Sequence, residues 1–246
     1  MVKWLITKII FKIHPLFYLV ALVCFLTGWF KNFVIFSSII CVHELGHFFF
    51  AICFKWRIEK ILLLPFGGIT IFNEKIDKPL LEEFFIALGG PIFQFIYFCI
   101  FKDNTVFFTY NMAILIFNLL PIYPLDGSRI LNIFFNILIP FKMSHLLSII
   151  ISYISFSLLF IYFLLERNIL FLFIILFVLL EIFKETIKHN YYFSRFLLER
   201  YMYNCIFKKE KVINHISKMK KQTRHIFNIG NNYYTEREII RKLFDK

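Results

Sequence analysis

Apolar residues occur along this chain in six long runs that shorter polar segments separate. The runs cover roughly residues 13–30, 33–54, 84–101, 105–120, 145–165 and 168–183. An α-helix of about 20 apolar residues crosses a bilayer, so each run predicts a membrane-spanning helix, with the fourth and sixth short for a full crossing. The pattern therefore predicts an all-α polytopic membrane domain over residues 1–183.

Lysine and arginine alternate in number between the segments that connect these runs. The segments before the first run and after the second, fourth and sixth carry three, five, two and fifteen, whereas each of the other three carries one. Cytosolic segments of membrane proteins are enriched in these residues. Six spans with both termini in the cytosol satisfy this rule. The second span then runs inwards, and its middle is reached more readily from the cytosolic side.

A stretch between the second and third runs is apolar but too short to cross a bilayer. It covers residues 61–72 and contains the pair Gly67 and Gly68. Two glycines between Ile, Leu, Thr and Phe residues indicate a β-hairpin that dips into the membrane, and an interfacial loop is the alternative. The edge of such a hairpin can hold an extended peptide by strand addition, so both glycines are candidate substrate-binding positions.

Composition agrees with a membrane protein. The chain is 59% hydrophobic with 36 phenylalanines and a mean hydropathy of +0.71, which lies outside the range of soluble globular domains. No cleavable signal peptide is expected, because no small-residue cleavage site follows the first apolar run. The five cysteines show neither CxxC spacing nor the framework of a secreted protein, so we interpret them as small apolar residues.

The second run contains ionisable residues that a membrane span rarely retains. His43, Glu44 and His47 lie in its middle. Positions i and i+4 share one face of a helix, so the two imidazoles can bind a single metal ion with the carboxylate beside it. This HExxH pattern of zinc sites also occurs by chance in soluble helices. At membrane depth the cost of burying three such groups favours a metal site, and a proton-relay or transport site is the alternative.

A second polar motif follows the fourth run, where residues 118–127 read NLLPIYPLDG. Pro121 and Pro124 end the helix, so the irregular backbone there must be buried or line a cavity. Asp126 by itself indicates a turn residue that caps the next helix, but beside a metal that lacks a ligand it is a candidate third ligand. Asn118 is the candidate oxyanion donor, and a helix-ending hydrogen bond is its alternative.

These residues together predict peptide hydrolysis. His43, His47 and Asp126 leave a fourth position for water, as in catalytic zinc sites. Bound zinc makes that water more acidic, and Glu44 can accept its proton and pass it to the leaving amine. The competing functions are a zinc or proton transporter and a catalytically silent membrane scaffold. A transporter would need polar residues in several spans, and the last two runs contain almost none.

The composition changes abruptly at residue 184. From there to residue 246 the chain has fifteen basic and six acidic residues, which is +9 of the total formal charge of +12. The pattern predicts a linker and a small cytosolic α/β tail, with a helix over 212–219, a strand over 225–229 and a helix over 235–244. A module of this size has only marginal stability by itself. Contact with a second copy or with the anionic membrane surface would stabilise it. No nucleic-acid motif accompanies the charge.

The two polar motifs together resemble the site-2 protease family of intramembrane zinc metalloproteases, peptidase family M50. The residues that carry this resemblance are His43, Glu44, Leu45, Gly46 and His47, then Asn118, Pro121, Pro124, Leu125, Asp126 and Gly127. The six-span layout and the tail that starts near Arg195 are similar to the sporulation branch of that family. The resemblance implies that His43, His47 and Asp126 bind one zinc ion and that Glu44 is the catalytic base.

The resemblance also implies a substrate and partners. In the sporulation branch the substrate is the inactive precursor of a sporulation sigma factor, of the pro-sigma-K type, and inhibitory membrane proteins keep the protease silent. The tail would correspond to about one repeat of a cystathionine-beta-synthase (CBS) type domain, which senses ATP or another nucleotide. Two chains would complete a pair of repeats, which implies a homo-oligomer.

Overall fold

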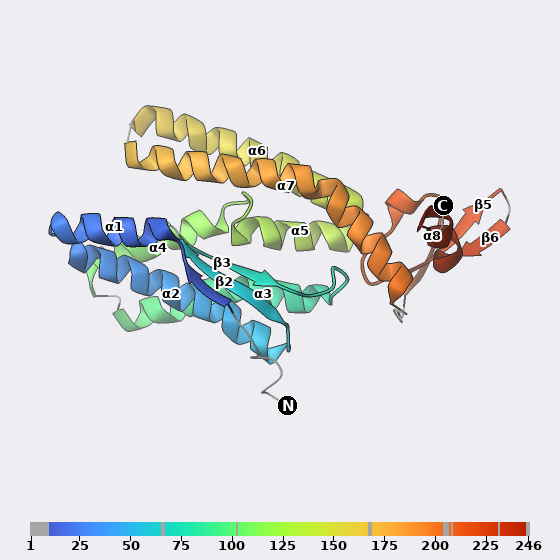
Figure 1. The fold of residues 1–246 in the computed structure, drawn as a ribbon, viewed down its shortest axis with the longest axis horizontal. Coiled ribbons are helices and arrows are strands. Elements are labelled where there is room, and N and C mark those ends of the chain that lie inside the picture. The colour runs from blue at the N-terminus through green and yellow to red at the C-terminus, as the bar shows by residue number, and fades with distance from the viewer. Residues whose placement is uncertain are drawn as a thin grey trace. The chain divides into compact units, whose positions relative to one another are not determined.

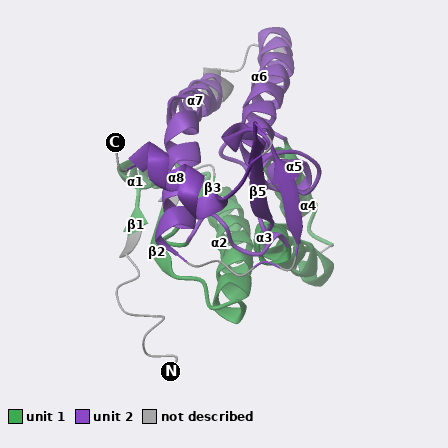
Figure 2. Ribbon diagram, turned by 90° about the vertical axis from the view of Figure 1, so that its right-hand side faces the viewer, with its two compact units in different colours: residues 1–74, 81–120 green, residues 75–80, 121–246 purple. Residues whose placement is uncertain are grey.

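A computed structural model describes residues 10–64, 67–101, 103–166, 169–203, 207, 209–230 and 232–244. The chain forms two compact units (Figure 2). The first unit comprises residues 1–74 and 81–120, and the second comprises residues 75–80 and 121–246. The HExxH motif therefore lies in the first unit, whereas Asp126 lies in the second.

Four apolar helices form most of the first unit (Figure 1). They are α1 (Pro15–Leu26), α2 (Phe30–Cys53), α3 (Leu80–Phe101) and α4 (Thr105–Leu119). The predicted span over residues 13–30 is helical only over α1, because Pro15 disfavours helical backbone in the residue before it and Gly28, with a φ of 78°, turns the chain after it. The helix is therefore shorter than the apolar run.

A three-stranded sheet completes the first unit. Its strands are β1 (Ile10–Ile13), β2 (Ile58–Leu64) and β3 (Gly67–Phe72), in the order β1-β2-β3. Strands β2 and β3 are antiparallel, and their register begins with Leu64 opposite Gly67. The hairpin prediction is confirmed for these strands, whereas its residues 65–66 lie outside the described residues. Strand β1, parallel to β2, escaped prediction because its partner lies far along the chain.

Helices α2 and α3 lie close together where two glycines meet. A Cβ atom at Gly46 would lie 2.1 Å from the carbonyl oxygen of Gly89, and a Cβ atom at Gly89 would lie 2.6 Å from the carbonyl oxygen of Gly46. Larger residues at either position would force the helices apart. This close crossing places the polar residues of α2 directly against the backbone of α3.

The second unit begins with three helices, α5 (Asp126–Leu138), α6 (Phe141–Glu166) and α7 (Ile169–Met202). The sixth apolar run, 168–183, is only the first part of α7, because the helix continues through the change in composition at residue 184. The division of the chain into a membrane domain over 1–183 and a tail over 184–246 stays a prediction.

The tail contains β4 (Glu210–Ile213), a 3-10 turn (Ile216–Lys218), β5 (Arg224–Ile229), β6 (Asn232–Thr235) and α8 (Glu236–Phe244). The predicted strand over 225–229 and the helix over 235–244 are confirmed. The predicted helix over 212–219 is wrong: Val212 and Ile213 pair with Ile226 and Phe227 of β5 in a parallel ladder, a contact that the local sequence pattern does not show.

A buried ion pair joins the segment between β3 and α3 to the tail. Arg200 Nε lies 2.7 Å from Asp77 Oδ2, and both side chains are almost fully buried. The backbone N–H of Gln222 donates to Asp77 Oδ1 at 2.9 Å. The adjoining tail core consists of apolar residues: Phe141, Phe196, Leu197, Ile213, Met219, Phe227, Ile239 and Ile240. Residues 75–80 therefore belong to the second unit although they connect two elements of the first.

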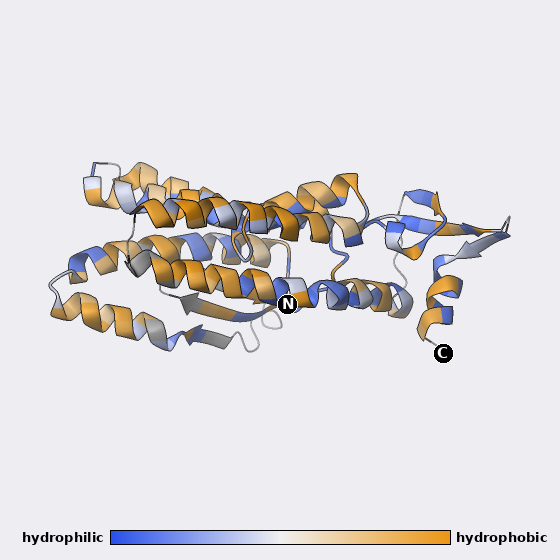
Figure 3. Cartoon of the chain, turned by 90° about the horizontal axis from the view of Figure 1, so that it is seen from above, coloured by the Kyte–Doolittle hydropathy of each residue, from blue (hydrophilic) through white to orange (hydrophobic). Residues whose placement is uncertain are grey.

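Three helices within the described residues are long and apolar enough to cross a membrane: Phe30–Cys53, Leu80–Phe101 and Phe141–Leu165. Two further apolar helices, Phe17–Leu26 and Thr105–Leu119, are shorter. Hydrophobic residues dominate the long helices, whereas the tail strands carry more polar residues (Figure 3). The number of six crossings and the cytosolic position of both termini stay predictions.

Candidate metal centre

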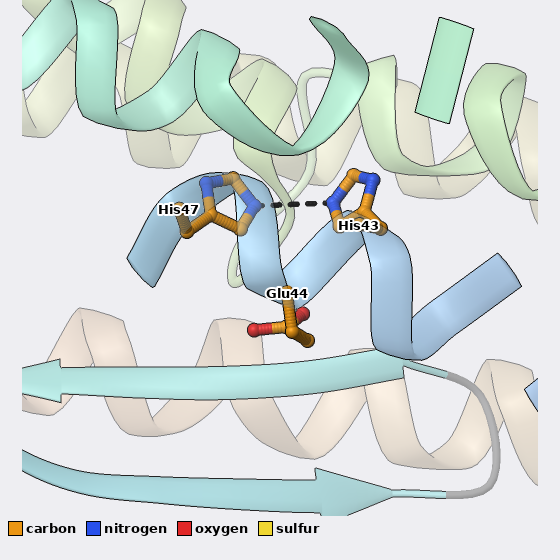
Figure 4. A group of neighbouring side chains, drawn as sticks. All are labelled: His43, Glu44 and His47. Carbon is orange, nitrogen blue, oxygen red and sulfur yellow. Dashed lines mark hydrogen bonds between the residues drawn. The ribbon is translucent and has the colours of Figure 1, made fainter. Parts of the chain in front are cut away.

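The two histidines of α2 present their ring nitrogens to each other. His43 and His47 lie one helical turn apart, and each is only 3% exposed. Their Nε2 atoms are 3.1 Å apart (Figure 4). In a tetrahedral site with Zn–N bonds of about 2.0–2.1 Å, two nitrogen ligands lie about 3.3–3.4 Å from each other. The spacing of the two Nε2 atoms therefore suits a shared zinc ion.

The other nitrogen of each ring is held by α3. His43 Nδ1 lies 2.9 Å from Oε1 of Gln94, and His47 Nδ1 lies 2.7 Å from the backbone carbonyl oxygen of Ile86. A carbonyl oxygen only accepts, so Nδ1 donates in both rings and each neutral ring keeps a lone pair on Nε2. Two lone pairs that face each other are stabilised by a cation between them. The chemistry of this donor set fits zinc.

Glu44 points away from the histidine rings and towards the hairpin (Figure 4). Thr70 Oγ1 of β3 donates to Glu44 Oε2 at 3.2 Å. A Cβ atom at Gly68 would lie 2.3 Å from Cδ of Glu44, so the glycine provides the space that the carboxylate occupies. Ligand atoms of His43, Glu44 and His47 nevertheless lie within 4.8 Å of one another. Glu44 is therefore close to both the metal position and the hairpin.

Gly90 of α3 provides the space for the two rings. A Cβ atom there would lie 2.4 Å from Nε2 of His47 and 2.5 Å from Nε2 of His43. The sequence analysis missed this glycine and also Gln94. The signal for Gln94 was available, since it is the one amide in the run 84–101 and lies one helical turn after Gly90. No sequence signal marks the carbonyl group of Ile86.

Asp126 lies in the second unit and is 7% exposed. It is the first residue of α5, but the capping position is Leu125, so Asp126 does not cap this helix as the alternative interpretation proposed. Its Oδ1 lies 4.0 Å from Nη1 of Arg129. The role of Asp126 as a zinc ligand stays a prediction.

The other candidate residues are divided between the units. Asn118 is buried near the end of α4, where the helix-ending hydrogen bond runs from the backbone N–H of Leu120 to the carbonyl group of Phe117. Pro121 and Pro124 precede α5 in the second unit. Gly67 begins β3, and a Cβ atom added to it would meet open space. The structure thus brings together His43, Glu44, His47 and Gly68. The roles of all nine candidate residues stay predictions.

Several known proteins are similar to this chain in sequence. Residues 31–102 match peptidase family M50. Stage IV sporulation protein FB from Bacillus subtilis is 35% identical over 213 residues, which cover 81% of this chain and 74% of that protein. Zinc metalloprotease MJ0392 from Methanocaldococcus jannaschii is 35% identical over 118 residues, which cover 42% of this chain and 34% of that protein.

A solved structure extends the similarity to the fold. The site-2 protease from Methanocaldococcus jannaschii superposes with a TM-score of 0.57 at 27% identity, and the match covers 73% of this chain and 92% of the other. This chain belongs to peptidase family M50, the site-2 proteases, which are integral membrane zinc metalloproteases that act on membrane-associated substrates.

Proposed function

We propose that this chain hydrolyses a peptide bond of a membrane-associated protein in or near the bilayer, with His43, His47 and Asp126 as zinc ligands. The observation that carries the proposal is the pair of Nε2 atoms 3.1 Å apart, with both Nδ1 atoms donating to α3. When bound, zinc polarises the scissile carbonyl group and makes a water molecule a stronger acid. The side chains of the protein carry out the remaining steps, above all the transfer of the proton.

Glu44 moves the proton in this mechanism. Its Oε2 accepts the Thr70 hydroxyl hydrogen bond, so we assign the incoming proton to Oε1. The oxygen of the water adds to the carbonyl carbon while Glu44 takes one of its protons. Glu44 then passes that proton to the amide nitrogen as the C–N bond breaks, and the products are a carboxylic acid and an amine. The carboxylate returns to its starting state after each turnover.

The hairpin provides a place for an extended substrate. A helical substrate hides its carbonyl groups in backbone hydrogen bonds, so it must unwind before it can be cut. Strand β3 is the last strand in the order β1-β2-β3, and its residues Gly68 and Thr70 are beside Glu44. We assign β3 as the strand along which the unwound segment lies, by addition to the sheet edge.

Gly68→Ala tests this assignment. The new methyl group would displace the Glu44 carboxylate, because the Cβ position is 2.3 Å from Cδ. Loss of a well-placed general base costs about 100-fold or more in rate, and the zinc content should stay that of the wild type. Turnover of a membrane-tethered reporter and bound zinc are measured together. The control is Ile71→Ala, an exposed residue of the same strand. Loss of zinc in Gly68→Ala would show that the hairpin supports the metal site instead.

Asp126→Ala tests the third ligand. Removal of a direct ligand should lower zinc affinity by more than the about 10- to 100-fold that loss of an outer hydrogen-bond partner costs. Competition with a chelator measures the affinity in purified protein. Asp103→Ala, an exposed acid between α3 and α4, is the control and should bind zinc as the wild type does. Unchanged affinity in Asp126→Ala would exclude Asp126 from the ligand set.

The natural substrate we propose is the precursor of a sporulation sigma factor, of the pro-sigma-K type. The similarity to stage IV sporulation protein FB supports a role in sporulation. The substrate and the inhibitory membrane partners are what the family resemblance of the sequence motifs implies. Co-expression with such a precursor should yield its cleaved form, whereas an unrelated membrane-tethered reporter of equal length should be cut more slowly. Equal cleavage of both would contradict the proposed specificity. The same resemblance predicts a cytosolic CBS-like tail that pairs with a second copy and binds ATP or another nucleotide.

A further inference from the structure

We propose that Gln94 is a positioning residue of the metal site, which fixes the His43 ring so that Nε2 faces the metal. The inference rests on the zinc site of the proposed function and adds to it a residue outside both polar motifs. Gln94 is 0% exposed within α3. A buried amide is costly unless its polar atoms are bonded, so its presence in an apolar helix requires a reason.

The orientation of the Gln94 amide follows from its two contacts. Its Nε2 donates to the backbone carbonyl oxygen of Asn111 at 2.7 Å, and that oxygen only accepts. Oε1 must therefore face His43, whose Nδ1 lies 2.9 Å away. An acceptor at this position requires the proton on Nδ1 and leaves the lone pair on Nε2. The backbone of α4 thus determines, through Gln94, which nitrogen of His43 can bind a metal.

The second histidine provides an internal comparison. His47 Nδ1 donates to the backbone carbonyl oxygen of Ile86, also on α3, at 2.7 Å. Both rings are therefore held in the same tautomer by the same helix, once through the backbone and once through a side chain. Ligand-orienting partners of this kind raise metal affinity, and removing one lowers it about 10- to 100-fold. The carbonyl group of Ile86 belongs to the backbone, so of these two Nδ1 partners Gln94 is the one that a substitution can remove.

Gln94 could matter only because it helps α3 pack against α2. A second side-chain contact between these two helices allows this packing role to be tested separately from the positioning of His43. The hydroxyl of Tyr97 donates to Oγ of Ser38 at 3.2 Å, and Tyr97 lies one helical turn after Gln94. Tyr97→Phe removes this hydrogen bond and keeps the ring. It is therefore the matched control for the loss of a polar contact between the same two helices.

The test compares Gln94→Met with Tyr97→Phe in the purified full-length protein in detergent. Zinc affinity is measured by competition with a chelator, and the site geometry by the absorption spectrum of the cobalt-substituted protein. Gln94→Met should bind zinc about 10- to 100-fold more weakly and change the cobalt spectrum, whereas Tyr97→Phe should change neither. Wild-type zinc affinity in Gln94→Met would overturn the proposal. Absence of zinc binding in the wild type would overturn the zinc site itself, so the two failures are distinct.

Gln94→Glu separates the two contacts of the amide. Its carboxylate still accepts from His43 but cannot donate to Asn111, so positioning predicts zinc affinity close to that of the wild type. A role limited to joining α3 and α4 predicts instead that Gln94→Glu loses as much affinity as Gln94→Met. If Gln94→Met fails to fold, the comparison of Gln94→Glu with the wild type decides: retained affinity supports positioning, and a tenfold loss or more overturns it.

Discussion

Glu44→Gln is expected to stop peptide hydrolysis while zinc stays bound. Glutamine has nearly the same shape as glutamate, so the Nε2 atoms of His43 and His47 and their contacts with α3 remain. It cannot accept the proton that the mechanism requires, and loss of a general base lowers the rate about 10²- to 10⁴-fold. The measurement is cleavage of a membrane-tethered reporter by purified protein in lipid, with bound zinc assayed in the same samples.

His43→Ala is the matched comparison for Glu44→Gln, because it should lose both zinc and activity. A hydrolase fails with either substitution, whereas a zinc transporter should tolerate a change at Glu44 better than one at His43. Cleavage by Glu44→Gln at the wild-type rate would contradict the role of this carboxylate as base. Zinc flux in sealed vesicles with no cleavage by the wild type would favour transport instead.

Gly90→Ala is expected to abolish tight zinc binding without unfolding the protein. The added methyl group would lie 2.4 and 2.5 Å from the Nε2 atoms of His47 and His43, much closer than van der Waals contact allows. Both rings would have to turn away, and their hydrogen bonds to α3 would be lost with the metal site. Alanine is a better helix former than glycine by about 1 kcal/mol, so a weaker helix would not explain the loss.

Zinc affinity and the thermal unfolding midpoint of Gly90→Ala are measured against Ile92→Ala, which changes a partly exposed residue of the same helix. We expect Gly90→Ala to lose zinc and Ile92→Ala to keep it. When both variants are compared without zinc, their unfolding midpoints should be similar. A Gly90→Ala protein that binds zinc as tightly as the wild type would show that the rings have more space than the structure gives them.

Most of what could be predicted follows from local patterns. The spacing of His43 and His47 places both on one face of a helix, and two glycines among β-formers predict a hairpin. The helix predicted over residues 212–219 shows the limit of this reasoning. Its residues also suit a strand, and the parallel ladder with β5 decides between the two. The strand β1 was missed for the same reason.

The candidate site likewise contains residues that local sequence patterns indicate and residues that only contacts between distant segments reveal. The sequence indicated His43, Glu44 and His47, because their chemistry and spacing lie within five consecutive residues. It also pointed to Gly68, but only as a hairpin position and without its contact to Glu44. Gln94 was missed, because nothing in the pattern connects this amide in an apolar run with a histidine 51 residues earlier. Asp126 was inferred from the need for a third ligand and stays a prediction.

The sequence by itself determined that His43 and His47 share one face of α2, that a hairpin follows this helix, and the type of chemistry that these residue types can perform. Only the tertiary structure decided which nitrogen of each ring faces the metal, because the acceptors Gln94 and Ile86 come from another helix. The tertiary structure also shows why Gly90 and Gly68 must lack side chains. Local periodicity reports which residues share a face, whereas contacts between distant segments depend on how those faces pack.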